Sequence, residues 1–87
     1  DCRKEFVDAF QDAAKLGTDE DITIENPFYN FSKADIIRKG TTLKVPYEIT
    51  WSCYLEEEQH CGACESCNNR KNAFKEAQIS DPTKYSI

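Results

Sequence analysis

Apolar residues recur every three or four positions at three places in the chain, which is the spacing of an amphipathic helix. The first predicted helix spans residues 3–16. Its apolar positions are Phe6, Val7, Phe10, Ala13 and Ala14. We expect Gly17 to end this helix, because glycine readily takes the left-handed conformation that follows many helices.

Ser32 and Asp35 mark the start of the second predicted helix, residues 33–39. Their spacing is that of a capping box, in which each side chain bonds the backbone N–H of the other residue. One side of this helix is apolar, through Ala34, Ile36 and Ile37. Gly40 is predicted to close it.

The third predicted helix runs from Cys64 to about Gln78, a stretch without proline or glycine. One stripe of its surface carries Cys67, Arg70, Phe74 and Ala77. Asp81 and Pro82 then interrupt the regular pattern.

Two other segments have the pattern of a β-strand. Residues 22–25 are rich in β-branched side chains, and residues 47–54 alternate between two classes of side chain. This period of two favours a strand or an extended run. The residues alone therefore predict a mainly helical chain with one or two short strands.

The composition limits the classes of function. The length of 87 residues predicts a single unit, 1–87. Only 39% of the residues are hydrophobic, so the small core should need an additional cross-link for stability. A net charge of −5 argues against binding to nucleic acid, which requires clustered basic residues. No apolar run approaches the roughly 20 residues of a membrane span. Because the chain contains no Met and starts within a helical pattern, we expect it to be part of a longer protein, with a processed mature protein as the alternative.

The five cysteines are the candidates for this cross-link. Four of them, spaced C-x7-C-x2-C-x2-C within segment 53–67, are Cys53, Cys61, Cys64 and Cys67. The fifth, Cys2, stands apart and is expected to be a packed or surface thiol. An odd number fits a disulfide framework poorly, so we expect a reducing, cytoplasmic setting.

This spacing favours one tetrahedral zinc ion per chain, held in a knuckle. Gly62 lies inside the first C-x2-C turn, and Cys64 and Cys67 share one face at the start of a helix, where the dipole favours thiolates. Sulfur would fill all four positions, so the site would be structural and not catalytic. Four thiolates and Zn²⁺ sum to a charge of about −2, which Arg70 is well placed to offset.

Other interpretations of the cysteines stay open. Three of them match the C-x2-C-x2-C of bacterial ferredoxins, although the next ligand of that motif is missing. Disulfides or free buried thiols need no metal at all. His60 could replace one ligand, or it could be a solvated loop residue.

Several segments together resemble the 7-cyano-7-deazaguanine synthases. The resemblance is carried by residues 45–54 (VPYEITWSCY), by residues 61–67 (CGACESC) with Arg70, and by residues 73–74. Residues 1–6, 32–37 and 81–85 are also similar to segments of that family. The combined TWSCY and CGxCxSC motifs are much more specific than C-x2-C alone.

The resemblance implies an ATP-dependent carbon–nitrogen ligase of the PP-loop ATP pyrophosphatase superfamily, with a Rossmann-like α/β fold. Such an enzyme converts 7-carboxy-7-deazaguanine and ammonia to the nitrile in queuosine biosynthesis. It also implies zinc on the same four cysteines and ATP as a further ligand of the longer enzyme. Its partners would be small molecules, with no nucleic acid and no membrane, and a homodimer is one assembly that we consider.

The chain departs from that family in two ways. It lacks the ATP loop Ser-Gly-Gly-x-Asp-Ser, so we expect residues 1–87 to be the C-terminal part of the enzyme, inactive alone and without its own ATP site. Gln78 stands where a glycine is expected after the helix. The alternative function is a stand-alone structural zinc module for protein interaction.

Overall fold

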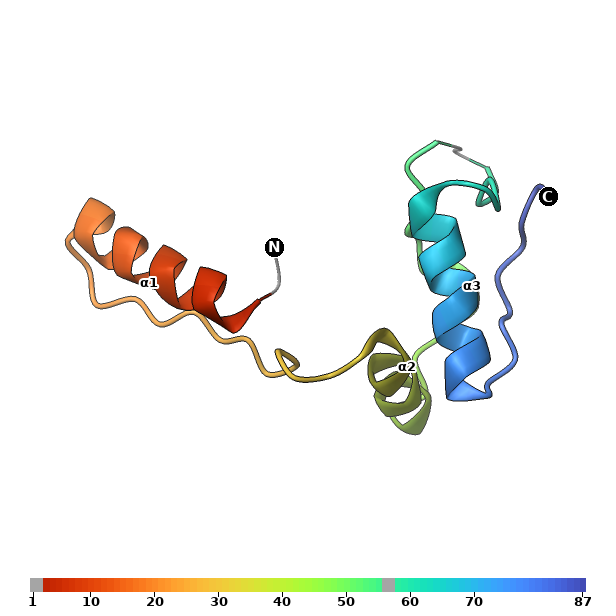
Figure 1. The fold of residues 1–87 in the computed structure, drawn as a ribbon, viewed down its shortest axis with the longest axis horizontal. Coiled ribbons are helices and arrows are strands. Elements are labelled where there is room, and N and C mark those ends of the chain that lie inside the picture. The colour runs from red at the N-terminus through yellow and green to blue at the C-terminus, as the bar shows by residue number, and fades with distance from the viewer. Residues whose placement is uncertain (1–2, 56–57) are drawn as a thin grey trace. The chain divides into compact units, whose positions relative to one another are not determined.

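The computed structural model describes residues 3–55 and 58–87. Its elements, in chain order, are α1 (Lys4–Thr18), α2 (Lys33–Thr42), the 3₁₀ helix η1 (Tyr47–Ile49) and α3 (Glu65–Ala77), as Figure 1 shows. They belong to two compact units, Asp1–Asn30 and Phe31–Ile87. None of the helices within the described ranges could span a lipid bilayer.

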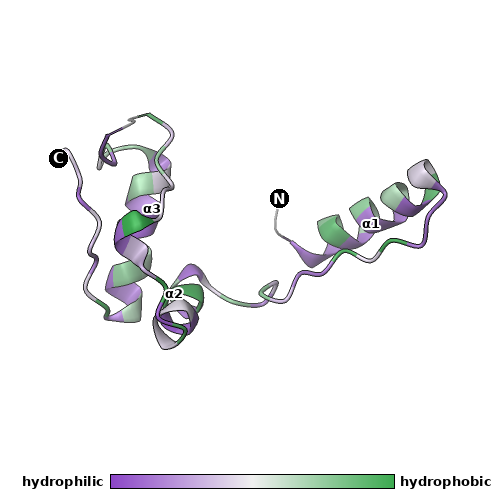
Figure 2. Ribbon diagram, turned by 180° about the vertical axis from the view of Figure 1, so that it is seen from behind, coloured by the Kyte–Doolittle hydropathy of each residue, from purple (hydrophilic) through white to green (hydrophobic). Residues whose placement is uncertain are grey.

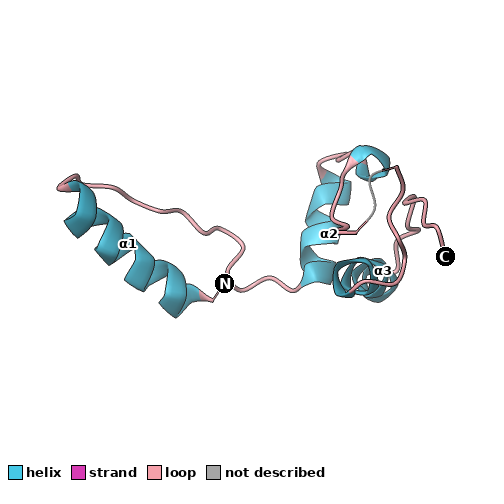
Figure 3. Ribbon diagram, turned by 90° about the horizontal axis from the view of Figure 1, so that it is seen from above, coloured by secondary structure: helices cyan, strands magenta, loops and turns pink. Residues whose placement is uncertain are grey.

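The prediction of strands is wrong for both segments. Residues 22–25 and 50–54 are irregular, residues 47–49 form η1, and Figure 3 shows helices and loops alone. In the part of the chain that the structure describes, β pairing is limited to one isolated parallel bridge between His60 and Tyr85. A strand needs a neighbour for its backbone groups, and neither segment has one here. The described chain is therefore mostly helical.

In the first unit, the chain turns back along α1. The backbone N–H of Ile24 donates to Oε1 of Gln11 over 2.6 Å. On the apolar side of α1, the side chains of Phe6 and Phe10 are exposed, and their rings stack with 6.2 Å between centroids. Figure 2 shows this mixture of hydrophobic and hydrophilic residues around the helix.

The predicted end of α1 at Gly17 is wrong. The helix continues to Thr18, whose hydroxyl donates to the carbonyl of Ala14 over 2.7 Å. Asp19 then takes the left-handed conformation, with φ of 54°. Aspartate tolerates this region better than most residues, so the glycine was not needed as the cap.

In the second unit, α2 and α3 pack together. Their buried side chains form one cluster, which consists of Ala34, Ile37, Ala73, Phe74 and Ala77. Tyr47 packs against this cluster from η1, and its ring meets that of Phe74 edge-on, with 5.2 Å between centroids. This packing fixes the C-terminal half of α3 against α2 and η1.

The capping box of α2 is confirmed, with Ser32 and Asp35 bonding each other's N–H groups over 3.0 and 3.1 Å. The predicted end at Gly40 is wrong, because α2 continues to Thr42. Gly40 is buried inside the helix, where an added Cβ would collide with the ring of Tyr47. The glycine therefore makes room for a packing contact and does not terminate the helix.

The third helix is confirmed to within one residue at each end. Cys64 is its N-cap and Gln78 its C-cap. Gln78 takes a left-handed φ of 59°, the conformation for which a glycine was expected.

Candidate metal centre

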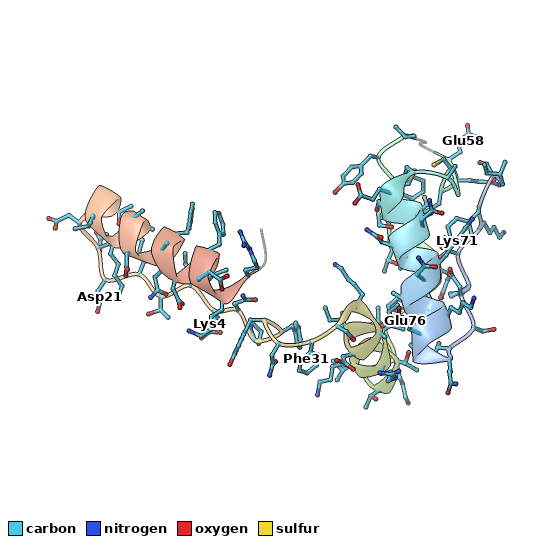
Figure 4. The ribbon with its side chains drawn as sticks, viewed as in Figure 1. Lys4, Asp21, Phe31, Glu58, Lys71 and Glu76 are labelled. Atoms are coloured by element: carbon cyan, nitrogen blue, oxygen red, sulfur yellow. The ribbon has the colours of Figure 1, made fainter. Side chains whose placement is uncertain are left out.

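Three separate pieces of the second unit bring four sulfur atoms together. Cys53 comes from the irregular segment after η1, Cys61 from a loop, and Cys64 and Cys67 from the start of α3. All four sulfurs lie within 4.8 Å of one another, in a group that could hold a metal ion. Figure 4 shows yellow sulfur atoms at the amino-terminal end of α3.

The spacing of the sulfurs suits a tetrahedral ion. Bonds of about 2.3 Å to Zn²⁺ place neighbouring sulfurs about 3.8 Å apart. The sulfurs of Cys61 and Cys67 are 3.9 Å apart. All four cysteines are free thiols, so none of them forms a disulfide.

Backbone N–H groups point at these sulfurs, and two of the sulfurs accept two such bonds each. The sulfur of Cys61 accepts bonds from Ala63 and Cys64, over 3.4 and 3.2 Å. The sulfur of Cys53 accepts bonds from Leu55 and Cys61, over 3.3 and 3.4 Å. Such donors stabilise negative charge on sulfur, as a metal-bound thiolate requires.

The two cysteines at the start of α3 differ in burial and in the pKa of their thiols. The backbone N–H of Cys67 donates to the sulfur of Cys64 over 3.4 Å, and this bond is the main reason why the pKa of Cys64 is lowered. Cys67 is fully buried, and burial raises the pKa of its thiol to about 12. A cation among the four sulfurs would lower this pKa instead, because it stabilises the thiolate directly.

Gly62 gives the knuckle its tight turn. It is buried and has a φ of +82°, a region that side chains disfavour. Its carbonyl accepts a bond of 2.7 Å from the ammonium of Lys71 on α3. The helix that carries two of the cysteines is thus tied to the turn that carries a third.

Arg70 ties α3 to the segment that leads to Cys53. Its guanidinium donates to the hydroxyl of Thr50 over 2.7 Å, to the carbonyl of Tyr47 over 3.0 Å and to the hydroxyl of Thr83 over 2.8 Å. A longer bond of 3.4 Å reaches the hydroxyl of Ser52. Since these bonds go to other groups, the role of Arg70 in offsetting thiolate charge stays a prediction.

His60 is neither solvated nor placed among the sulfurs. It is 4% exposed, and its ring lies against Trp51 and Tyr85 at centroid distances of 4.3 and 5.8 Å. Its Nε2 accepts the backbone N–H of Ser52 over 3.2 Å. Burial, together with the charge of Arg70, lowers its pKa and thus favours the neutral ring, which braces the loop before Cys61.

Sequence reasoning missed the residues that hold the loops of this site. Ser52, Lys71, Thr83 and Tyr85 contact residues nine or more positions away, so spacing carries no signal for them. Asp81 in turn accepts bonds from Thr83 and Tyr85. Cys2, the isolated thiol, lies outside the described residues.

Comparison with known proteins finds one family and several similar relatives. The profile of a family described as "Queuosine biosynthesis protein QueC" matches residues 1–78. A protein of Methanoculleus marisnigri named 7-cyano-7-deazaguanine synthase is 51% identical over 87 residues, which cover 98% of this chain and 39% of the relative. Proteins of the same name from Thermoplasma volcanium and Campylobacter fetus are 49% and 45% identical, over 99% and 98% of this chain and 37% and 39% of their own length.

The chain thus spans about two fifths of the length of the curated relatives that it matches. No solved structure matches it. The profile covers most of the chain, including all four clustered cysteines, and the relatives match nearly all of it. The chain belongs to the QueC family.

Proposed function

We propose that Cys53, Cys61, Cys64 and Cys67 hold one structural Zn²⁺. The observation that supports this best is the close approach of four sulfurs, three of them buried, with N–H donors turned toward them. Four thiolates leave no position for water or substrate, so the ion would contribute to folding and not to chemistry. A reducing, cytoplasmic compartment would keep these thiols available.

We further infer that residues 1–87 act as one part, the C-terminal part, of a longer 7-cyano-7-deazaguanine synthase. The relatives that support this inference carry that name and are about two and a half times as long as the matched region. The longer enzyme would have the Rossmann-like PP-loop fold and would activate the carboxylate of 7-carboxy-7-deazaguanine with ATP, form an amide from ammonia and dehydrate it. Its ATP loop would lie outside these residues, since the chain has no Ser-Gly-Gly-x-Asp-Ser sequence.

In that enzyme, the zinc would position α3 and the segment before Cys53. The ion would join the start of α3 to residues 50–53, and Arg70 would join them a second time one turn later. Substrate would meet a surface whose loops are fixed at both places. This role differs from that of a stand-alone interaction module, which would need no further enzyme.

A chimaera tests this function. The matched C-terminal region of the Methanoculleus marisnigri relative is replaced by the 87 residues, and nitrile formation is measured from 7-carboxy-7-deazaguanine, ATP and ammonia. We expect an active chimaera, and a loss of at least about tenfold in activity and in bound zinc with Cys67→Ser, because the fully buried ligand has no substitute. Cys2→Ser, which changes the cysteine outside the cluster, is the matched control.

Two results would contradict the proposal. An inactive but folded and zinc-loaded chimaera would show that these residues do not serve as the C-terminal part of this synthase. Full activity of the Cys67→Ser chimaera without zinc would show that the four-cysteine site is dispensable.

A further inference from the structure

The segment after α3 returns along that helix to the cysteine knuckle. Figure 1 shows it beside α3, with its end near the loop that precedes the helix. The backbone N–H of Ser86 donates to the carbonyl of His60 over 2.8 Å, and Tyr85 pairs with His60 in the parallel bridge. The contact is therefore made next to Cys61, one of the four clustered cysteines.

Two contacts place this segment directly on the knuckle turn. A Cβ added to Gly62 would collide with the main-chain oxygen of Ile87, so the two backbones touch. The ammonium of Lys71 donates to the carbonyl of Gly62 over 2.7 Å and to the main-chain oxygen of Ile87 over 3.3 Å. It also lies 4.6 Å from the ring centroid of Tyr85, within the range of a cation–π contact.

The near end of the segment is bonded to α3, because Arg70 donates to the hydroxyl of Thr83 over 2.8 Å. Within the segment, the hydroxyl of Tyr85 donates to the carboxylate of Asp81 over 2.6 Å, and the backbone N–H of Thr83 donates to the same carboxylate over 2.9 Å. The Tyr85 ring packs against the buried cysteines. The segment is thus held at Thr83 by Arg70, at Tyr85 by the buried cysteines and at its end by the knuckle turn.

We propose that residues 81–87 form a clasp that slows metal exchange at the four-cysteine site, with Lys71 as its fastening. This inference rests on the proposed zinc site. A metal can leave a closed set of four thiolates only after one ligand moves away or another ligand enters. Movement of Cys61 requires the Gly62 turn to open, and the clasp and Lys71 hold that turn on two sides.

The test is the rate at which zinc passes from the loaded 87-residue chain to a strong chelator, followed with a coloured metal indicator. Lys71→Met keeps much of the length of the side chain and removes its charge and its hydrogen bonds. We expect zinc release to be about tenfold faster, which corresponds to one charge-assisted hydrogen bond. Lys75→Met, at an exposed lysine one turn further along α3, is the matched control and should match the unchanged chain.

A second variant removes part of the clasp itself, by ending the chain after Lys84. It should also bind one zinc and release it at least about tenfold faster, since the contacts of both Tyr85 and Ile87 are lost. Helix content measured by circular dichroism with zinc bound shows whether each variant is folded. Release at the unchanged rate from both folded variants would overturn the clasp.

The two proposals fail in different ways. If the unchanged chain binds no zinc, the zinc site is overturned, and the clasp with it. If every variant binds one zinc and Lys75→Met accelerates release as much as Lys71→Met, the zinc site stands and the clasp is overturned.

Discussion

Replacing Arg70 by lysine keeps one positive charge on α3 and removes the planar fork that holds the neighbouring segments. The guanidinium reaches Thr50, Tyr47 and Thr83 over 2.7 to 3.0 Å, in two different directions. An ammonium is a single point of charge and cannot reach both ends of this fork at once. Arg70→Lys should therefore break the link to either residues 47–50 or Thr83.

The cost follows from the bonds that are lost. A hydrogen bond from a charged donor contributes about 1.5–3 kcal/mol when it is protected, and less where water can replace it. Arg70 is half-buried, so we expect Arg70→Lys to lower the free energy of unfolding by about 2 kcal/mol. Arg38→Lys is the control, because Arg38 is exposed and bonds Asp35 and the carbonyl of Glu76, and its loss should cost under about 1 kcal/mol.

The assay is urea unfolding followed by circular dichroism, with the free zinc concentration buffered at one value because bound metal adds to apparent stability. The slope of the transition must stay constant for the comparison to hold. An Arg70→Lys chain as stable as the unchanged chain, or no less stable than Arg38→Lys, would refute the idea that this fork joins α3 to the loops of the four-cysteine group.

Two further predictions concern buried contacts of the second unit. Burial and the bond to Asp81 raise the pKa of Tyr85 to about 12, so the folded chain keeps a proton that the unfolded chain loses near pH 10. The free energy of unfolding should fall as the pH rises from about 10 to about 12, and it should fall less in Tyr85→Phe. An ultraviolet titration of this variant should lack the tyrosine ionisation near pH 12. Gly40→Ala should destabilise the chain by about 1–3 kcal/mol despite the better helix propensity of alanine, because the Cβ displaces the Tyr47 hydroxyl from its 2.8 Å bond to the carbonyl of Ile37. Urea unfolding would show a smaller loss in a Tyr47→Phe background, and equal losses in both backgrounds would contradict this explanation.

The helices were predictable because their signals are local. The repeat of apolar residues and the Ser32–Asp35 box act within one or two turns, and the structure has helices at all three places. The helix ends were less predictable. Gly40, for example, makes room for the side chain of Tyr47 and does not end its helix. Asp19 and Gln78 take a left-handed conformation that residue type alone assigns to glycine.

The alternation in residues 47–54 has a different cause from the one predicted. Tyr47 packs into the core between α2 and α3, whereas Cys53 joins the sulfur cluster. Two separate clusters thus take two of the residues that a strand would place on one face, while Ile49 and Trp51 of that face are exposed. Pattern reasoning could not detect this, because it assumes one continuous surface.

The cysteine group was predictable from spacing alone, because C-x2-C turns and a helix start bring sulfurs together by local geometry. The contacts that hold the loops around this group could not be predicted in this way. Lys71 binds a carbonyl nine residues before it, and Tyr85 approaches His60 from a segment 25 residues away. Contacts between such distant positions arise only when the chain folds back on itself.

The most direct test is the metal itself. The chain, purified in reducing buffer, should contain one zinc ion, and X-ray absorption at the zinc edge should show four sulfur neighbours at about 2.3 Å. Iron with acid-labile sulfide, a nitrogen neighbour in place of one sulfur, or a folded chain without metal would contradict the account.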